Sequence, residues 1–146
     1  MITSNSCYCL DLNVYQTVQG MSAAAQIVKT GGTIIMAAEC WDGIPSNSDY
    51  ETILTSVSSV NDLMKFIKDN ESTLKDTWQI YYQALIQQKA NVYIYSDKLD
   101  DKIIKRALFN PVKDLSKLTD ALVSKIVPYA RICILPEGPQ TIPYLK

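Results

Sequence analysis

One apolar stripe at helical spacing dominates the first quarter of the chain. Asn13 can cap a helix there, and Gln16 three residues later completes a capping box. Gly31 and Gly32 then supply the glycines that commonly end a helix. The apolar positions share one helical face, which is therefore expected to be buried: Val14, Val18, Met21, Ala25 and Val28.

Five further segments have the character of helices. They span residues 48–57, 61–68, 73–88, 99–108 and 116–127. The first of them begins with a second capping box, formed by Ser48 and Glu51. The last three are expected to bury one face, because their apolar residues recur every three or four positions. The stripe of the longest segment comprises Leu74, Trp78, Tyr81 or Tyr82, and Leu85. The stripe of the last segment comprises Leu118, Leu122 and Ile126.

Strands are predicted between these helices. Residues 33–38 form a continuous apolar run, which is typical of a strand covered on both faces. Similar strands are expected at 91–96 and 131–135, and residues 1–4 could end a first one. Strands that alternate with helices indicate parallel pairing with right-handed crossovers. The pattern therefore predicts a single α/β domain over residues 1–146, a Rossmann-like three-layer sandwich of about four mostly parallel strands with helices on both faces.

Composition narrows the functional classes. The chain has 146 residues, 47% of them hydrophobic, and a formal net charge of −1, so binding to nucleic acid or to an anionic membrane is not expected. No apolar run reaches the roughly 20 residues of a membrane span. Four cysteines at irregular spacing do not form a disulfide framework, and a reduced, cytoplasmic protein is expected. The chain contains no histidine.

A polar patch is predicted at the start of the first helix. Tyr15, Gln16 and Gln19 are three or four residues apart, so their side chains share one surface. The patch lies beside the N–H groups of the first turn and the positive end of the helix dipole, where a carboxylate can bind. In parallel sheets, ligands bind beyond the carboxyl ends of the strands. The patch lies there, because the first helix begins just after the loop that follows the first strand. The same pattern also fits an ordinary solvated helix face.

Three segments resemble a known family. They are residues 11–24, which contain Tyr15-Gln16, residues 31–43, which begin Gly31-Gly32, and residues 135–144, which begin Leu135-Pro-Glu-Gly-Pro. Together they resemble the C-terminal domain of the nickel-pincer-dependent lactate racemase family. The resemblance covers nearly the whole chain, and the first and last segments are its most specific parts.

The resemblance implies roles for four residues. Tyr15 and Gln16 match the family's Tyr-Gln-x-x-Lys substrate-binding motif, and Gln19 takes the place of its lysine. Trp78 matches a tryptophan that packs near the cofactor, although its position on an apolar stripe equally fits a core residue. The implied substrate-binding residues are thus Tyr15, Gln16 and Gln19, with Trp78 at the cofactor, and no catalytic or metal-binding residue in this chain.

The family implies a divided active site. Its enzymes invert the α-carbon of a 2-hydroxy acid with a nickel-pincer nucleotide, whose lysine and histidine partners come from an N-terminal domain. The chain is therefore expected to be a C-terminal substrate- and cofactor-capping domain that is inactive alone. Its partner would be that N-terminal catalytic domain, in the same or a companion chain. The alternative is a stand-alone module that binds small carboxylates and has lost catalysis.

Other polar residues are weaker candidates. Cys7 and Cys9 replace the glycine and proline of the family's Gly-Tyr-Pro pattern, and with Cys40 they could bind a soft metal or simply be small buried residues. Three strand-end carboxylates could act as acid–base groups or be solvated: Asp42, Asp97 and Glu137. Lys98 and Lys102 could bind an anion or be ordinary surface lysines.

Overall fold

A parallel sheet forms the centre of the computed structural model, which describes residues 1–70, 77–126 and 128–144. All pairings between neighbouring strands are parallel, and the order across the sheet is β4-β3-β2-β1-β5. The predicted α/β class with a parallel sheet is confirmed. The strands are β1 (Ile2–Ser4), β2 (Gly32–Ala37), β3 (Ala90–Tyr95), β4 (Asn110–Val112) and β5 (Ile134–Leu135).

The two edges of the sheet differ from the prediction. Strand β4 was not expected, because Pro111 lies at its centre and proline cannot donate to a sheet. An edge position removes that objection, since one side of an edge strand needs no partner. At the other edge, the predicted strand at 131–135 is confined to Ile134–Leu135. Five strands are therefore described where about four were predicted.

The helices begin largely at side-chain caps. Asn13 and Ser48 accept backbone N–H bonds as predicted, and Ser59, Asp100 and Asp114 do so as well. The helices are α1 (Val14–Ile27), α2 (Asp49–Ser56), α3 (Val60–Asp69), α4 (Trp78–Lys89), α5 (Asp101–Arg106) and α6 (Leu115–Ser124), with a 3₁₀ turn η1 (Gly138–Gln140) near the end. Residues 73–76 of the helix predicted over 73–88 lie outside the described residues.

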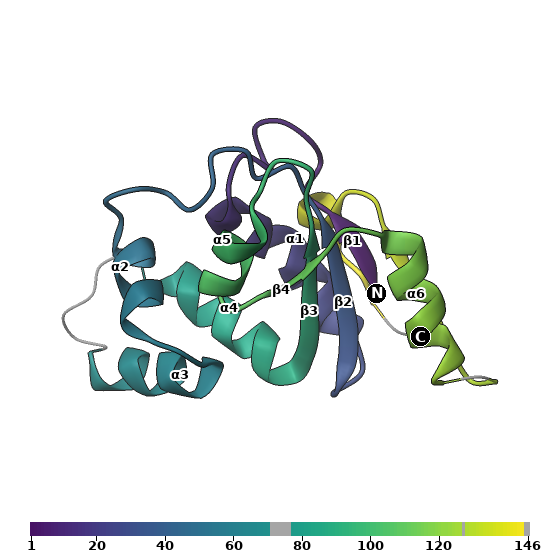
Figure 1. The fold of residues 1–146 in the computed structure, drawn as a ribbon. Coiled ribbons are helices and arrows are strands. Elements are labelled where there is room, and N and C mark those ends of the chain that lie inside the picture. The colour runs from purple at the N-terminus through teal and green to yellow at the C-terminus, as the bar shows by residue number, and fades with distance from the viewer. Residues whose placement is uncertain (71–76, 127, 145–146) are drawn as a thin grey trace.

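The two helical layers that cover the sheet differ in size. Figure 1 shows α6 on one side of the sheet and the other helices on the opposite side. The main core lies between the sheet and α1, where Val18 and Met21 are fully buried with Ile34, Met36 and Ile94. The predicted burial of the α1 stripe is thus confirmed for Val14, Val18, Met21 and Val28, whereas Ala25 is only half-buried. None of the helices in the described part of the chain combines the length and apolar character that a membrane crossing demands.

The predicted inner face of α4 is wrong, and that of α6 is confirmed only in part. On α4 the large apolar residues point outward: Trp78, Tyr81, Tyr82 and Leu85 are 48%, 41%, 50% and 37% exposed. Leu74 of the same stripe lies outside the described residues. On α6 no side chain is fully buried, and Ile126 just beyond it is 55% exposed. Leu118 and Leu122 are only half-buried.

Glutamines occupy the buried face of α4. Gln83 accepts a hydrogen bond from the Tyr50 hydroxyl and donates to the Ala107 carbonyl at 2.8 Å. Gln87, one turn later, donates to the Leu108 carbonyl at 2.7 Å. Burial raises the pKa of Tyr50, which therefore stays a neutral donor. Because each amide has a buried partner, these polar residues can face the core while the aromatic ones face water.

Candidate functional site

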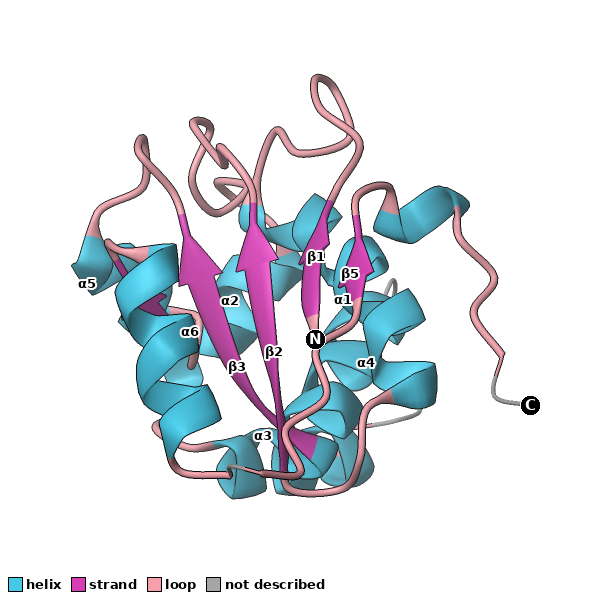
Figure 2. Ribbon diagram, turned by 90° about the vertical axis from the view of Figure 1, so that its right-hand side faces the viewer, coloured by secondary structure: helices cyan, strands magenta, loops and turns pink. Residues whose placement is uncertain are grey.

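The loops that follow the strands gather at the carboxyl end of the sheet. Figure 2 shows the strands pointing toward this end, with the long loops after β1 and β2 above it. Gly43, from the loop after β2, accepts the Val14 backbone N–H at 2.9 Å. Glu137, just after β5, forms an antiparallel bridge with Asn5. Three strand ends therefore meet at the start of α1.

Asn5 holds the start of α1 against the carboxyl end of the sheet. Its side chain is 1% exposed, and its amide donates to the carbonyls of Leu10 and, at 3.1 Å, Gln16. Its side-chain oxygen accepts the Gly20 N–H at 2.9 Å. A Cβ atom at Gly20 would lie 2.7 Å from that oxygen, so the approach requires glycine. One buried residue thereby fixes both the loop after β1 and the first turns of α1.

The first turn of α1 is less open to a ligand than the sequence indicated. Of its first three N–H groups, that of Val14 is bonded to Gly43, and that of Gln16 to the Asn13 side chain at 3.0 Å. The prediction that free backbone N–H groups here could bind a carboxylate is therefore wrong for the N–H groups of Val14 and Gln16. A ligand here would have to be bound mainly by side chains.

Four aromatic rings form a row that begins in the core and ends in water. The Tyr15 ring contacts Tyr50 edge-to-face at a centroid distance of 5.4 Å and Trp78 at 6.2 Å. Trp78 in turn contacts Tyr82 at 6.3 Å. Because edge-to-face pairs fix the relative orientation of rings, Tyr15 and Trp78 form a stable wall. We call this pair the Tyr15–Trp78 wall.

A buried glutamine ties the two sides of this wall together. Gln79 is 1% exposed and donates its side-chain amide to the Tyr15 carbonyl at 2.5 Å. It follows Trp78 in the chain, so a single residue links the start of α4 to the start of α1. Since Trp78 is half-exposed, the alternative that it is a core residue is wrong.

Gln16 and Gln19 lie beside the wall on the half-buried surface of α1. Within the described residues, neither side chain forms a hydrogen bond to the protein. Each amide can donate to a carboxylate or accept from a hydroxyl. The four predicted site residues thus occupy the facing starts of α1 and α4, and their roles stay predictions.

Asp11 is a buried carboxyl group that the sequence pattern did not single out. It is 8% exposed, its side chain accepts the Glu39 N–H at 3.4 Å, and its carbonyl accepts the Cys40 N–H at 2.9 Å. It therefore joins the loops after β1 and β2 just below the site. The sequence carries no local signal for this burial, because the backbone N–H groups of Glu39 and Cys40 that bond to Asp11 lie far along the chain.

The other acid–base and anion-binding candidates are exposed residues. The Asp97 carboxylate accepts the Tyr95 hydroxyl at 2.9 Å, and this hydrogen bond raises the pKa of Tyr95. The remaining candidates are exposed side chains: Asp42, Glu137, Lys98 and Lys102. Their positions fit solvated surface groups.

The cysteines do not assemble into a metal site. Cys40 is buried beside Thr17, which fits the alternative of a small buried residue. Cys7 and Cys9 are exposed, so that alternative is wrong for them, and the three cysteines do not come together. Among the described residues no three His, Cys, Asp or Glu side chains are placed to hold a metal ion. All four cysteines, including half-buried Cys133, are free thiols.

The thiols should differ sharply in reactivity. Burial raises the pKa of Cys40 to about 12, so at pH 8 almost none of it is the reactive thiolate. A thiol reagent added to the folded protein at pH 8 should modify exposed Cys7 and Cys9 first and Cys40 last. Mass spectrometry of the peptides measures the order, and four thiols should react after non-reducing denaturation. A denatured count of two would contradict the free-thiol assignment.

Comparisons with known proteins identify the family of the chain. Residues 1–142 match the family model of the lactate racemase C-terminal domain. The lactate racemase of Thermoanaerobacterium thermosaccharolyticum is 32% identical over 143 residues, which cover 97% of this chain and 34% of the relative. That of Lactiplantibacillus plantarum is 30% identical over 142 residues, covering 94% of this chain and 32% of the relative.

A solved structure matches as well. The lactate racemase apoprotein from Thermoanaerobacterium thermosaccharolyticum has a TM-score of 0.84 at 32% sequence identity, over 97% of this chain and 34% of the other. The chain spans about a third of the length of the curated relatives it matches. The resemblance noted in three segments is thus confirmed over nearly the full length. The chain belongs to the lactate racemase C-terminal domain family.

Proposed function

We propose that this chain is the substrate- and cofactor-capping domain of a lactate racemase-like protein that acts on a small 2-hydroxy acid. The observation that carries the proposal is the Tyr15–Trp78 wall with the amides of Gln16 and Gln19 beside it. It combines an aromatic surface with hydrogen-bond donors, which are the two elements needed to bind a planar cofactor and a hydroxy acid. The catalytic groups would come from the portion of the relatives that this chain does not match.

The side chains of this domain fit the ring of a nickel-pincer nucleotide but not its metal. Trp78 is half-exposed and held edge-on to Tyr15, so it can cover a planar ring. The donor set for nickel is missing, since the chain has no histidine and its described residues offer no cluster of three ligands. When bound, the cofactor would accept and return the substrate's hydride. This chain's part would be to exclude water with Tyr15 and Trp78 and to orient the carboxylate with Gln16 and Gln19.

A chimera tests the proposal. This chain replaces the matched C-terminal third of the Thermoanaerobacterium thermosaccharolyticum lactate racemase, and conversion of D-lactate to L-lactate is measured after loading with the cofactor. The chimera should racemise lactate, and Trp78→Ala should reduce kcat/KM at least tenfold. Tyr129→Ala, at an 84% exposed position, serves as the control and should change little. A folded chimera without turnover would contradict the proposal, as would turnover by the isolated chain.

A second candidate function has specific support. Gln19 lacks the charge of the family's lysine, and Cys7 and Cys9 replace the family's glycine and proline, so the chain could be a stand-alone module that binds small carboxylates. Titration of the isolated chain with lactate, followed by NMR shifts of the α1 amides, distinguishes the two. Saturable millimolar binding by the isolated chain would favour the module, because half a cleft should bind far more weakly.

Gln19→Lys should strengthen binding of a hydroxy acid by on the order of tenfold in the chimera. A charge-assisted hydrogen bond contributes roughly 1.5–3 kcal/mol, whereas a neutral one contributes about 1 kcal/mol. The gain should shrink as salt rises, because mobile ions screen the added charge. The KM for lactate at low and high ionic strength measures both effects. An unchanged KM at low salt would mean that residue 19 does not face the ligand.

A further inference from the structure

Large apolar side chains cover the outer surface of α4. Trp78, Tyr81, Tyr82 and Leu85 are all more than a third exposed although they lie within two turns of one helix. We call this set the α4 outer face. Isolated exposed apolar residues are common, but a contiguous group of aromatic residues usually marks a protein interface.

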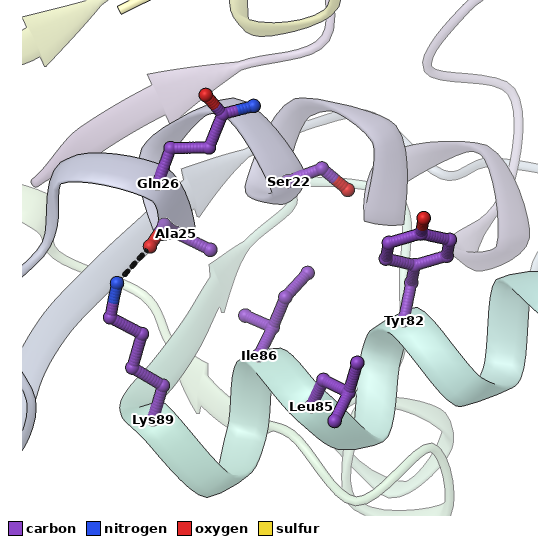
Figure 3. Close-up of a pocket in the computed structure, with 7 residues that line it drawn as sticks. All are labelled: Ser22, Ala25, Gln26, Tyr82, Leu85, Ile86 and Lys89. Atoms are coloured by element: carbon purple, nitrogen blue, oxygen red, sulfur yellow. Dashed lines mark hydrogen bonds between the residues drawn. The ribbon is translucent and has the colours of Figure 1, made fainter. Parts of the chain in front are cut away.

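A groove between α1 and α4 adjoins this face. Figure 3 shows the groove, a cavity of about 240 Å³ whose walls are formed by Ser22, Ala25 and Gln26 of α1 and by Tyr82, Leu85 and Ile86 of α4. At one end, the Lys89 ammonium donates to the Ala25 carbonyl at 2.5 Å. Because that charge is engaged by the end of α1, the groove offers an apolar floor with polar groups only at its rim. Its chemistry fits apolar side chains and not an anion.

The α4 outer face is continuous with the candidate site. Tyr82 contacts Trp78 at 6.3 Å, and Trp78 contacts Tyr15 at 6.2 Å. On α1, Gln19, Ser22 and Gln26 follow one another at helical spacing, so the site patch runs directly into the groove wall. A protein body seated in the groove would therefore also reach the Tyr15–Trp78 wall.

The length of the relatives indicates what covers this surface. The matched part is 34% and 32% of the two lactate racemases, so about two thirds of each lies outside it. We infer that the α4 outer face and the adjoining groove are the docking surface for that N-terminal portion, which would place aliphatic or aromatic side chains in the groove. The inference rests on the proposed function and names the surface through which the partner engages.

Labelling of tyrosine tests the inference. Hydroxyl-radical footprinting with mass spectrometry compares Tyr81 and Tyr82 in the chimera and in the isolated chain. Both should be modified at least fivefold more slowly in the chimera, while Tyr129 should react equally in the two. The double variant Tyr82→Ser, Leu85→Ser removes only exposed side chains, so the isolated domain should keep its circular dichroism spectrum.

The docking strength is then measured with the two portions as separate co-expressed chains. The double variant should weaken the complex at least tenfold, and Tyr129→Ser should leave it unchanged. If Tyr81 and Tyr82 are labelled as fast in a chimera that racemises lactate as in the isolated chain, the inference alone is overturned. If they are protected but the chimera does not racemise lactate, the proposed function alone is overturned. If neither the chimera nor the two co-expressed chains form a folded complex, both are overturned. A dimer of the isolated chain that the double variant dissociates would assign the surface to a second copy and overturn the inference.

Discussion

Replacement of Asn5 by leucine should lower the free energy of unfolding by about 3–5 kcal/mol. The substitution keeps the side-chain volume but removes the bonds to the Leu10 and Gln16 carbonyls and to the Gly20 N–H. Each buried polar group left without a partner costs about 1–3 kcal/mol. Urea denaturation followed by circular dichroism measures the loss.

A second asparagine provides the matched control. Asn110 is exposed and donates one side-chain hydrogen bond, to the Val92 carbonyl at 3.0 Å. Asn110→Leu should therefore cost no more than about 1 kcal/mol, since water replaces the lost partner. Equal losses at the two positions would mean that Asn5 does not organise the loop after β1.

Replacement of Gly138 by alanine should cost about 2–3 kcal/mol, because the added methyl group overlaps backbone atoms. A Cβ atom there would lie 2.7 Å from the Gly20 carbonyl oxygen and 2.6 Å from the Thr3 hydroxyl. Backbone cannot rotate out of the way, so the turn η1 would have to separate from α1. The midpoint of thermal unfolding measures the loss, and a shift in the NMR signals of α1 would locate it.

Gly31 separates steric overlap from backbone strain. It has a φ of +75°, and a Cβ atom there would meet nothing within 4 Å. Gly31→Ala should therefore cost only the strain of the left-handed conformation, about 1 kcal/mol. A larger loss at Gly31 than at Gly138 would contradict the close packing of η1 on α1.

The elements that the sequence predicts well are those whose signal is local. The α1 stripe, the caps at Asn13 and Ser48 and the apolar run of β2 each depend on residues a few positions apart. Strand β4 was not predicted, because a proline such as Pro111 is tolerated only in an edge strand. The order of the strands in the sheet depends on residues far apart in the sequence.

The orientation of α4 could not be predicted for a similar reason. Gln79 and Gln83 are buried because their partners, the carbonyls of Tyr15 and Ala107, lie far away in the chain. Apolar periodicity counts only the side chains of the helix itself, so it assigned the aromatic residues to the core. At the candidate site, helical spacing grouped Tyr15 with Gln16 and Gln19, but the contact with Trp78 needed the folded structure.

The place of β1 in the sheet has a consequence for biosynthesis. Strand β1 pairs with β5, and Ser4 bonds to the Pro136 carbonyl 132 residues later. At about 5–20 residues per second, one side of β1 waits on the order of 10 s on the ribosome for its neighbour. During that time its unpaired backbone is open to wrong partners. Because the Asn5–Glu137 bridge forms with the same late segment, the region around the candidate site would be completed only after residue 137 has been synthesised.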